Sequence, residues 1–99
     1  MRQTVTFLGL SWEVIGEIGK NDKFNLLEEK YFRLLTSKNG RKVVVVHTEK
    51  WSPNNSKDSP RFRKCYDKHL LKYLLPGEEK KLIESLSHKG YRPESELII

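Results

Sequence analysis

A chain of 99 residues supports one modest hydrophobic core, so we expect a single domain over residues 1–99. The apolar fraction of 36%, the charged fraction of 32% and the ten aromatic side chains fit a soluble globular protein and argue against wholesale disorder. No apolar run approaches the roughly 18 residues that a membrane helix needs, and the single cysteine, Cys65, excludes an internal disulfide framework. We therefore expect a cytoplasmic protein in a reducing compartment.

The chain begins with two expected strands. Residues 3–10 (QTVTFLGL) alternate apolar and hydroxyl side chains, which is the period of two that a half-buried strand shows. Residues 11–19 fit either a short helix capped by Ser11 or a second strand. Gly16 and Gly19 weaken a helix, so we favour the strand.

Residues 24–36 fit both a helix and a strand. A helix would be capped by Asp22 and would gather its apolar side chains on one face. However, Asn39-Gly40 followed by four consecutive valines is a strong hairpin signal, because both turn residues tolerate positive φ and valine favours a sheet. We therefore favour a hairpin over residues 31–48, with the helix over residues 22–36 as the open alternative.

The stretch over residues 60–75 is predicted to be a helix. Ser59 followed by Pro60 is a helix-start signal, because the hydroxyl accepts from free N–H groups and the fixed φ of proline suits the first helical position. At about 100° per residue, an apolar face forms from Phe62, Tyr66, Leu70, Tyr73 and Leu74, and a basic face forms nearly opposite it from Arg61, Lys64, Lys68 and Lys72.

A second helix is predicted over residues 78–89. Pro76-Gly77 separates it from the first, acidic residues lie in its first turn, and Gly90 is placed to close it in the left-handed conformation. Its inward residues are expected to be Leu82, Ile83 and Leu86.

These elements predict an α+β fold. An antiparallel sheet over residues 3–48 is packed by a helical hairpin over residues 60–75 and 78–89. The expected contact residues are Phe62, Tyr66, Leu70, Tyr73, Leu82, Ile83 and Leu86. The apolar tail over residues 97–99 fits an edge strand, a docked segment or a frayed end.

The net charge of +6 is concentrated in the middle of the chain. Residues 38–72 hold ten lysines and arginines against three acids, whereas the rest of the chain holds nine against ten. Concentrated positive charge attracts polyanions, of which nucleic acid is the commonest.

The basic helix face and the hairpin loop before the valine strand together predict a site for a nucleic-acid backbone. Successive turns of a helix space such side chains by about 5.4 Å, which suits a row of phosphates. An aromatic ring beside lysines can stack on a base, although Trp51 equally fits as a cover for the end of the valine strand. The expected binding residues are Lys38, Arg41, Lys42, Trp51, Arg61, Lys64, Lys68 and Lys72.

The favoured function is therefore non-catalytic binding of DNA or RNA. The alternative is a small interaction or inhibitor protein that docks on an acidic surface of a larger protein, such as a nucleic-acid enzyme. A metal-dependent nuclease is the remaining enzyme class, but a nuclease needs acids that converge on a metal and the sequence shows no such convergence.

No cofactor, metal site or catalytic residue is predicted. Cys65 and His69 lie four residues apart, a spacing that places two ligands on one helix face, but two ligands do not complete a metal site. We interpret the pair as a partly buried thiol beside a solvated histidine.

Overall fold

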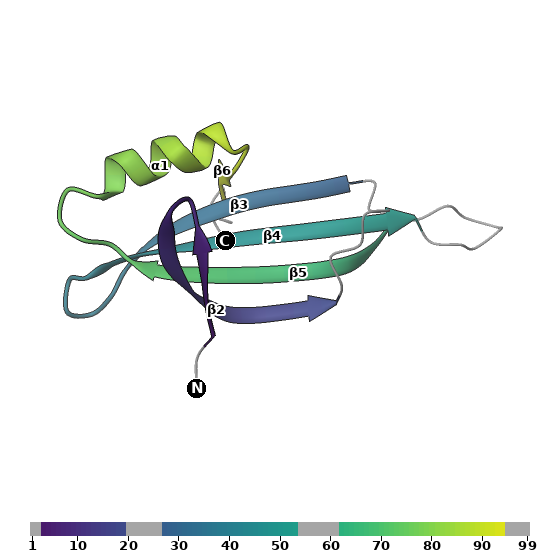
Figure 1. Cartoon of the computed structure of the whole chain (residues 1–99), viewed down its shortest axis with the longest axis horizontal. Coiled ribbons are helices and arrows are strands. Elements are labelled where there is room, and N and C mark those ends of the chain that lie inside the picture. Colours follow the sequence, from purple (N-terminus) through teal and green to yellow (C-terminus); the bar gives the residue numbers. More distant parts are fainter. Residues whose placement is uncertain (1–2, 20–26, 54–61, 95–99) are drawn as a thin grey trace.

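The computed structural model describes residues 3–19, 27–53 and 62–94 (Figure 1). The elements within these ranges are β1 (Thr4–Phe7), β2 (Leu10–Gly19), β3 (Leu27–Thr36), β4 (Lys42–Pro53), β5 (Phe62–Tyr73), α1 (Glu79–His88) and β6 (Arg92–Pro93). No helix among the described residues is long and apolar enough to cross a membrane.

The described strands form one six-stranded sheet in the order β1-β2-β5-β4-β3-β6. All neighbours are antiparallel except β6, which runs parallel to β3. The helix α1 lies over one side of this sheet, which we call the helix face, and the other side is the far face (Figure 1). The predicted antiparallel sheet with a helical hairpin is therefore wrong: within the described ranges the sheet is mixed and carries one helix.

The predicted helix over residues 60–75 is replaced by the strand β5. Tyr66 and Leu70 gave the helical pattern because residues four apart share a face in a helix, but they also share a face in a strand. The strand β5 lies between β2 and β4, so its backbone hydrogen bonds are satisfied along both edges. The proposed start signal at Ser59 and Pro60 lies outside the described residues.

The predicted second helix is confirmed by α1. Glu79 lies in its first turn, and Gly90 has φ of 89° just beyond its end, where the amide of Tyr91 donates to the Leu86 carbonyl at 2.9 Å. Leu82 and Leu86 are buried against the sheet, because they lie four residues apart on one face of the helix.

The 31–48 hairpin and two N-terminal strands are also confirmed, but the first strand is shorter than the predicted 3–10, because residues 8–9 form a turn and Leu10 begins β2. The strand β3 pairs with β4 from Leu27↔Trp51 to Thr36↔Lys42, so the hairpin is longer than predicted. Its loop closes where expected: the Gly40 amide donates to the Ser37 carbonyl at 2.9 Å, and Gly40 has φ of 82°. The alternative of a helix over residues 22–36 is wrong for residues 27–36, which form the strand β3. Residues 22–26 lie outside the described part of the chain.

The core lies between the helix face and α1. Its buried residues are Trp12, Phe32, Val44, Val46, Leu70, Leu82, Leu86 and Tyr91. The hairpin of β1 and β2 closes one side of this core, because Phe7 contacts both Trp12 and Tyr91 edge to face at 5.5 and 5.6 Å between ring centroids.

Most of the predicted contact residues are in this region. Tyr66, Leu70, Leu82 and Leu86 are buried, and Ile83 is partly buried. Tyr73 instead lies on the far face and is 41% exposed, because strand alternation turns it away from Leu70. The side chain of Phe62 and the tail over residues 97–99 are not among the described parts of the chain.

Candidate functional site

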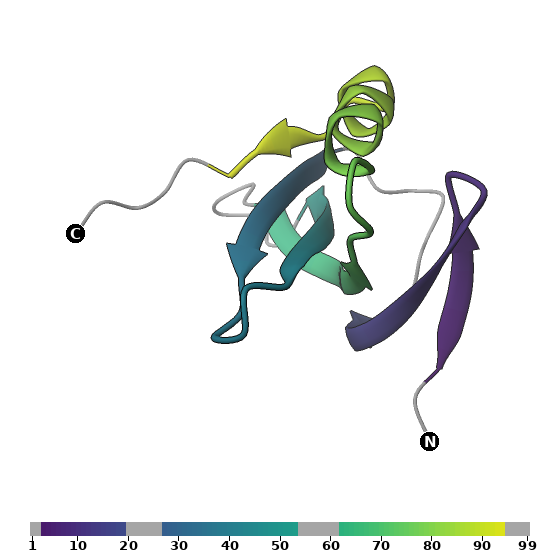
Figure 2. The same ribbon diagram turned by 90° about the vertical axis from the view of Figure 1, so that its left-hand side faces the viewer.

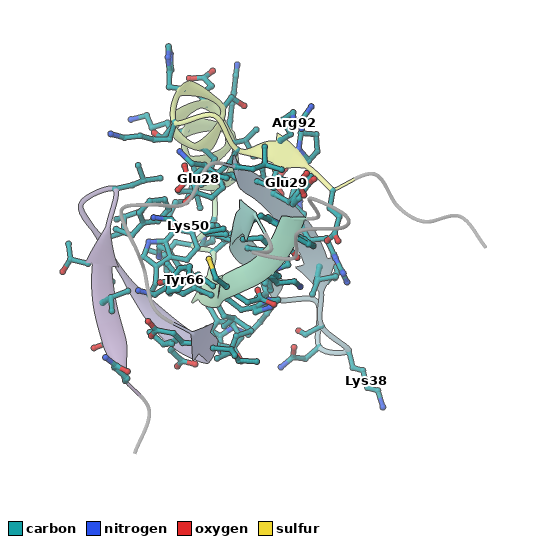
Figure 3. All side chains as sticks on the ribbon, turned by 90° about the vertical axis from the view of Figure 1, so that its right-hand side faces the viewer. Glu28, Glu29, Lys38, Lys50, Tyr66 and Arg92 are labelled. Atoms are coloured by element: carbon teal, nitrogen blue, oxygen red, sulfur yellow. The ribbon has the colours of Figure 1, made fainter. Side chains whose placement is uncertain are left out.

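Four of the predicted binding residues meet at one end of the sheet. Figure 2 looks onto this end, where the loop between β3 and β4 and the start of α1 both face the viewer. We call it the basic end: its cationic residues are Lys38, Arg41 and Lys42 from the hairpin, Lys72 from β5, and Lys80 and Lys81 from α1. Figure 3 shows the Lys38 side chain projecting away from the sheet.

Two acids at the start of α1 form ion pairs with two of these lysines. Lys42 Nζ lies 2.9 Å from Glu79 Oε1, and Lys72 Nζ lies 3.3 Å from Glu78 Oε1. The Arg41 guanidinium lies over the Tyr73 ring at 4.5 Å from its centroid. A hollow of about 680 Å³ lies between the hairpin loop and the segment that joins β5 to α1, and Arg41, Lys42 and Glu79 are among its lining residues.

Glu78 makes this joining segment sensitive to acid. Its pKa is lowered because its Oε1 accepts a hydrogen bond from the Leu75 amide at 3.1 Å and pairs with Lys72. A carboxyl whose pKa is lowered by folding stabilises the protein above its unfolded pKa, and this contribution is lost as the pH falls through the lowered value. We expect Glu78→Gln to lower the urea midpoint slightly at pH 6 and to match the unsubstituted protein more closely below about pH 4.

The other predicted binding residues do not join the basic end. Trp51 and Lys64 lie near the opposite end of β4 and β5, about 30 Å from Lys42 at the usual rise per strand residue. Lys68 lies on the helix face, on the same side as Leu70. Arg61 lies outside the described residues. The predicted basic helix face is therefore wrong, because residues 62–73 form a strand.

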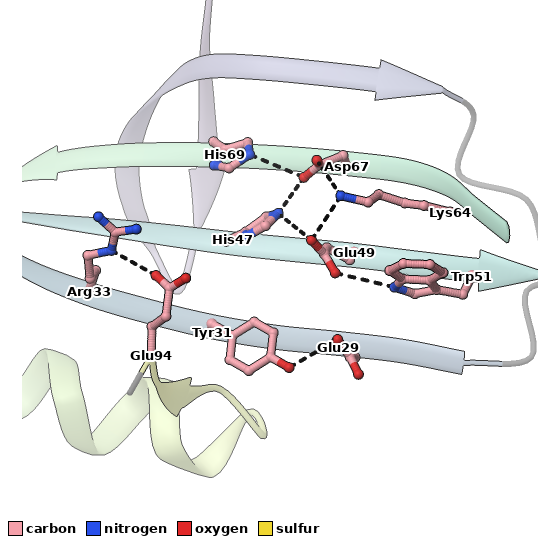
Figure 4. A network of polar contacts seen from close by, with 10 residues as sticks. All are labelled: Glu29, Tyr31, Arg33, His47, Glu49, Trp51, Lys64, Asp67, His69 and Glu94. Atoms are coloured by element: carbon pink, nitrogen blue, oxygen red, sulfur yellow. Dashed lines mark hydrogen bonds and ion pairs between the residues drawn. The ribbon is translucent and has the colours of Figure 1, made fainter. Parts of the chain in front are cut away.

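The far face carries a polar cluster that the sequence interpretation missed (Figure 4). We call it the histidine cluster; it consists of His47 and Glu49 on β4 and of Lys64, Asp67 and His69 on β5. The register places His47 opposite His69 and Glu49 opposite Asp67. Because alternate residues share a face, all four side chains project to the same side of the sheet.

A bulge adds Lys64 to this cluster. The register between β4 and β5 shifts between Lys50 and Trp51, so that Tyr66 faces Lys50 and Lys64 faces Trp51. Cys65 is the extra residue, and its Sγ donates to the Lys50 carbonyl at 3.3 Å. The shift turns Lys64 to the far face, whereas Lys68 and Lys72 remain on the helix face.

Asp67 lies at the centre of the histidine cluster. Its Oδ1 contacts His47 Nε2 and lies 3.2 Å from His69 Nε2, while its Oδ2 lies 3.3 Å from Lys64 Nζ. The two imidazole rings stack at 4.0 Å between centroids with 17° between their planes. Lys64 Nζ also lies 3.1 Å from Glu49 Oε1, so one ammonium joins both carboxylates.

Burial and charge perturb three of these groups. Burial raises the pKa of Asp67, but the hydrogen bond from His47 and the nearby positive charges outweigh it, so this pKa is lowered overall. Burial and the neighbouring His47 lower the pKa of His69. The hydrogen bond to Glu49 raises the pKa of Lys64. Such perturbed groups on one surface mark it as a candidate site.

A hollow of about 280 Å³ adjoins the two histidines. Tyr31, Arg33 and Glu94 also line it, and Arg33 Nε pairs with Glu94 Oε2 at 2.7 Å. Trp51 lies beside the cluster with its Nε1 3.3 Å from Glu49 Oε2. Its ring is half-buried on the far face.

The sequence does contain the signal for this cluster. In HTE (47–49) and DKH (67–69), the first and third residues project to one face of a strand, which brings two histidines and two carboxylates to that face. The predicted helix over 60–75 hid this pattern, because residues 67 and 69 point about 200° apart on a helix. Cys65, the predicted neighbour of His69, is not part of the three-residue group whose ligand atoms converge.

The chain matches no protein-family model, no curated protein and no solved structure.

Proposed function

We propose that this protein is a non-catalytic nucleic-acid-binding protein that contacts the phosphate backbone through its basic end, in an intracellular compartment. One observation carries the proposal: three segments that are distant in the sequence bring their lysines and arginines to one end of the sheet. In the described part of the chain, this end holds six cationic residues and two acids, Glu78 and Glu79. Such an excess of positive charge attracts polyanions and speeds their encounter.

Four cations of the basic end are available to a phosphate. Lys38, Arg41, Lys80 and Lys81 are exposed, and none of them is ion-paired to an acid in the described ranges. Lys42 and Lys72 are instead paired with glutamates, which reduces their attraction for an external anion. The main candidates for phosphate contacts are Arg41 and Lys80, which line the hollow, and Lys38, which projects from the hairpin loop.

Arg41 is the best oriented of the three. Its guanidinium lies over the Tyr73 ring, so this packing restricts the side chain before an anion arrives. Because the Arg41 side chain is already restricted, it loses less conformational entropy when an anion binds. The hollow beside it, lined by Gly40 and Lys80 among others, gives room for a sugar-phosphate segment.

Removing these three charges tests the proposal. The triple variant Lys38→Ala, Arg41→Ala and Lys80→Ala is expected to weaken binding to both single-stranded and duplex oligonucleotides. Affinity falls as salt rises, and each lost phosphate contact reduces the steepness of log affinity against log salt by roughly 0.7–0.9. The steepness should therefore decrease by about 2–3 in the triple variant. Fluorescence anisotropy of labelled oligonucleotides over a salt series measures both quantities.

The matched control removes the same charge elsewhere. Lys68→Ala, Lys89→Ala and Arg92→Ala together change the net charge equally, but none of these residues lies at the basic end. This variant should retain most of the affinity and of the salt slope. Equal losses in the two triple variants, or no nucleic-acid binding by the unsubstituted protein at low salt, would contradict the proposal.

A further inference from the structure

We propose that His47, Asp67 and His69 form a binding site for a divalent first-row transition-metal ion, with Zn²⁺ as the representative ligand. This site lies on the far face and is separate from the basic end. One ligand atom from each of the three residues lies within 4.8 Å of the others. Figure 4 shows both histidines directed to the same carboxylate of Asp67.

The donor set determines the class of ion. Two imidazole nitrogens with one carboxylate oxygen suit Zn²⁺, Co²⁺, Ni²⁺ and Fe²⁺, whereas Ca²⁺ and Mg²⁺ prefer oxygen ligands throughout. The distance between His69 and Asp67 is compatible with shared coordination, whereas His47 is hydrogen-bonded directly to Asp67 and must separate from it to admit an ion. His69 Nε2 lies 3.2 Å from Asp67 Oδ1, and two ligands of a tetrahedral zinc with bonds of about 2.0 Å lie about 3.3 Å apart.

The sheet holds the three ligands in place before an ion arrives. His47 and His69 face each other on β4 and β5, which both have paired neighbours on either side. Asp67 and His69 are two residues apart on one strand and therefore share a face. Both strands lie inside the sheet, so the backbone of these residues is already ordered. Binding an ion therefore costs little backbone conformational entropy.

Lys64 orients the carboxylate. Its Nζ contacts Asp67 Oδ2 and Glu49 Oε1 at 3.3 and 3.1 Å, which leaves Asp67 Oδ1 directed to the two histidines. Partners of this kind around a metal site fix the orientation of its ligands. The rings are stacked, so a small rotation of one ring must make their nitrogens converge. His69, which is 37% exposed, has room for that rotation.

Three protein ligands leave at least one coordination position open, which is typical of catalytic rather than structural metal sites. The hollow lined by Tyr31, Arg33 and Glu94 adjoins both histidines. The open position can therefore hold water or an exchangeable anionic ligand from that hollow.

Titration of the tag-free 99-residue chain with Zn²⁺ at pH 7.5 tests the site by isothermal calorimetry. The unsubstituted protein should bind one ion per chain. Asp67→Asn should weaken binding at least about tenfold, since it removes the charged ligand, and the double variant His47→Gln and His69→Gln should abolish it.

Two matched controls change the remaining histidine and the single cysteine of the chain. His88→Gln changes the histidine that lies at the end of α1, outside the cluster, and Cys65→Ser removes the thiol. Both should bind Zn²⁺ as the unsubstituted protein does. The proposal is overturned if the unsubstituted protein binds no ion, if the double variant binds equally well, or if either control loses binding.

Imidazole nitrogen NMR gives an answer that needs no variant and so does not depend on how the variants fold. Zn²⁺ should shift the ring nitrogens of His47 and His69 and leave those of His88 in place. Shifts confined to His88, or none at one equivalent of Zn²⁺, would overturn the assignment.

Discussion

Replacing Trp12 by alanine is expected to remove about 3–5 kcal/mol of the free energy of unfolding, as large-to-small changes of buried aromatics do. Trp12 is 1% exposed and is among the largest side chains fully enclosed by the described residues. Its indole Nε1 donates to the Phe7 carbonyl at 2.8 Å, so the variant loses a hydrogen bond as well as packing. A domain of this size has roughly 5–15 kcal/mol in total, so the variant should be close to unfolding.

The second tryptophan provides a matched control. Trp51 lies half-buried on the far face, where its indole contacts Glu49 rather than the core. Trp51→Ala should therefore reduce the free energy of unfolding by less than half as much. Urea denaturation followed by far-ultraviolet circular dichroism measures both variants without relying on tryptophan fluorescence. Equal losses in the two variants would show that the core does not lie between the sheet and α1.

The difference between the two tryptophans could not be predicted from the sequence. Both follow polar residues and lie in strands, and local patterns do not show which face of a strand meets the helix. Burial of Trp12 depends on contacts with Phe7 and on the position of Tyr91 beyond α1. Phe7 is only five residues from Trp12, but the contact between Phe7 and Tyr91 joins parts of the chain that are far apart in the sequence, so this packing follows from topology.

Features that depend on local chemistry were predictable. The Asn39-Gly40 loop and the end of α1 at Gly90 both require positive φ, and glycine marks such positions in a sequence. In the turn between β1 and β2, positive φ occurs at Leu8 (55°) as well as at Gly9, and a leucine does not mark such a position in the sequence. Leucine seldom adopts this conformation, so the sequence interpretation extended one strand through the turn.

The assignment of residues 60–75 failed for a different reason. A spacing of four residues between Tyr66 and Leu70 is common to helices and strands, and the residues between them decide the outcome. In a strand, Asp67 and His69 project to the face opposite Tyr66 and Leu70, but Lys68 interrupts the apolar face and weakens the alternation. The same alternation builds the histidine cluster, so the error about secondary structure also concealed the candidate metal site.

Replacing Gly19 by alanine is the second change expected to have a large effect. Gly19 ends β2 opposite Tyr66 and has φ of 84°, where an L side chain is strained by roughly 1–2 kcal/mol. A Cβ at this position would also lie 1.9 Å from the Cys65 carbonyl oxygen and 2.8 Å from its carbon. Backbone must move to relieve this overlap, so we expect a total loss of about 2–5 kcal/mol in the free energy of unfolding.

Gly40→Ala separates the two causes of this loss. Gly40 has nearly the same φ, 82°, but apart from its chain neighbours no atom of the described residues lies within 4 Å of the Cβ that the variant would add. Its loss should be about 1–2 kcal/mol, from backbone strain alone. Urea denaturation of both variants gives the difference, which measures the close approach of β2 to the Cys65 bulge. Because that bulge turns Lys64 to the far face, a difference near zero would contradict the packing that places Lys64 beside Asp67.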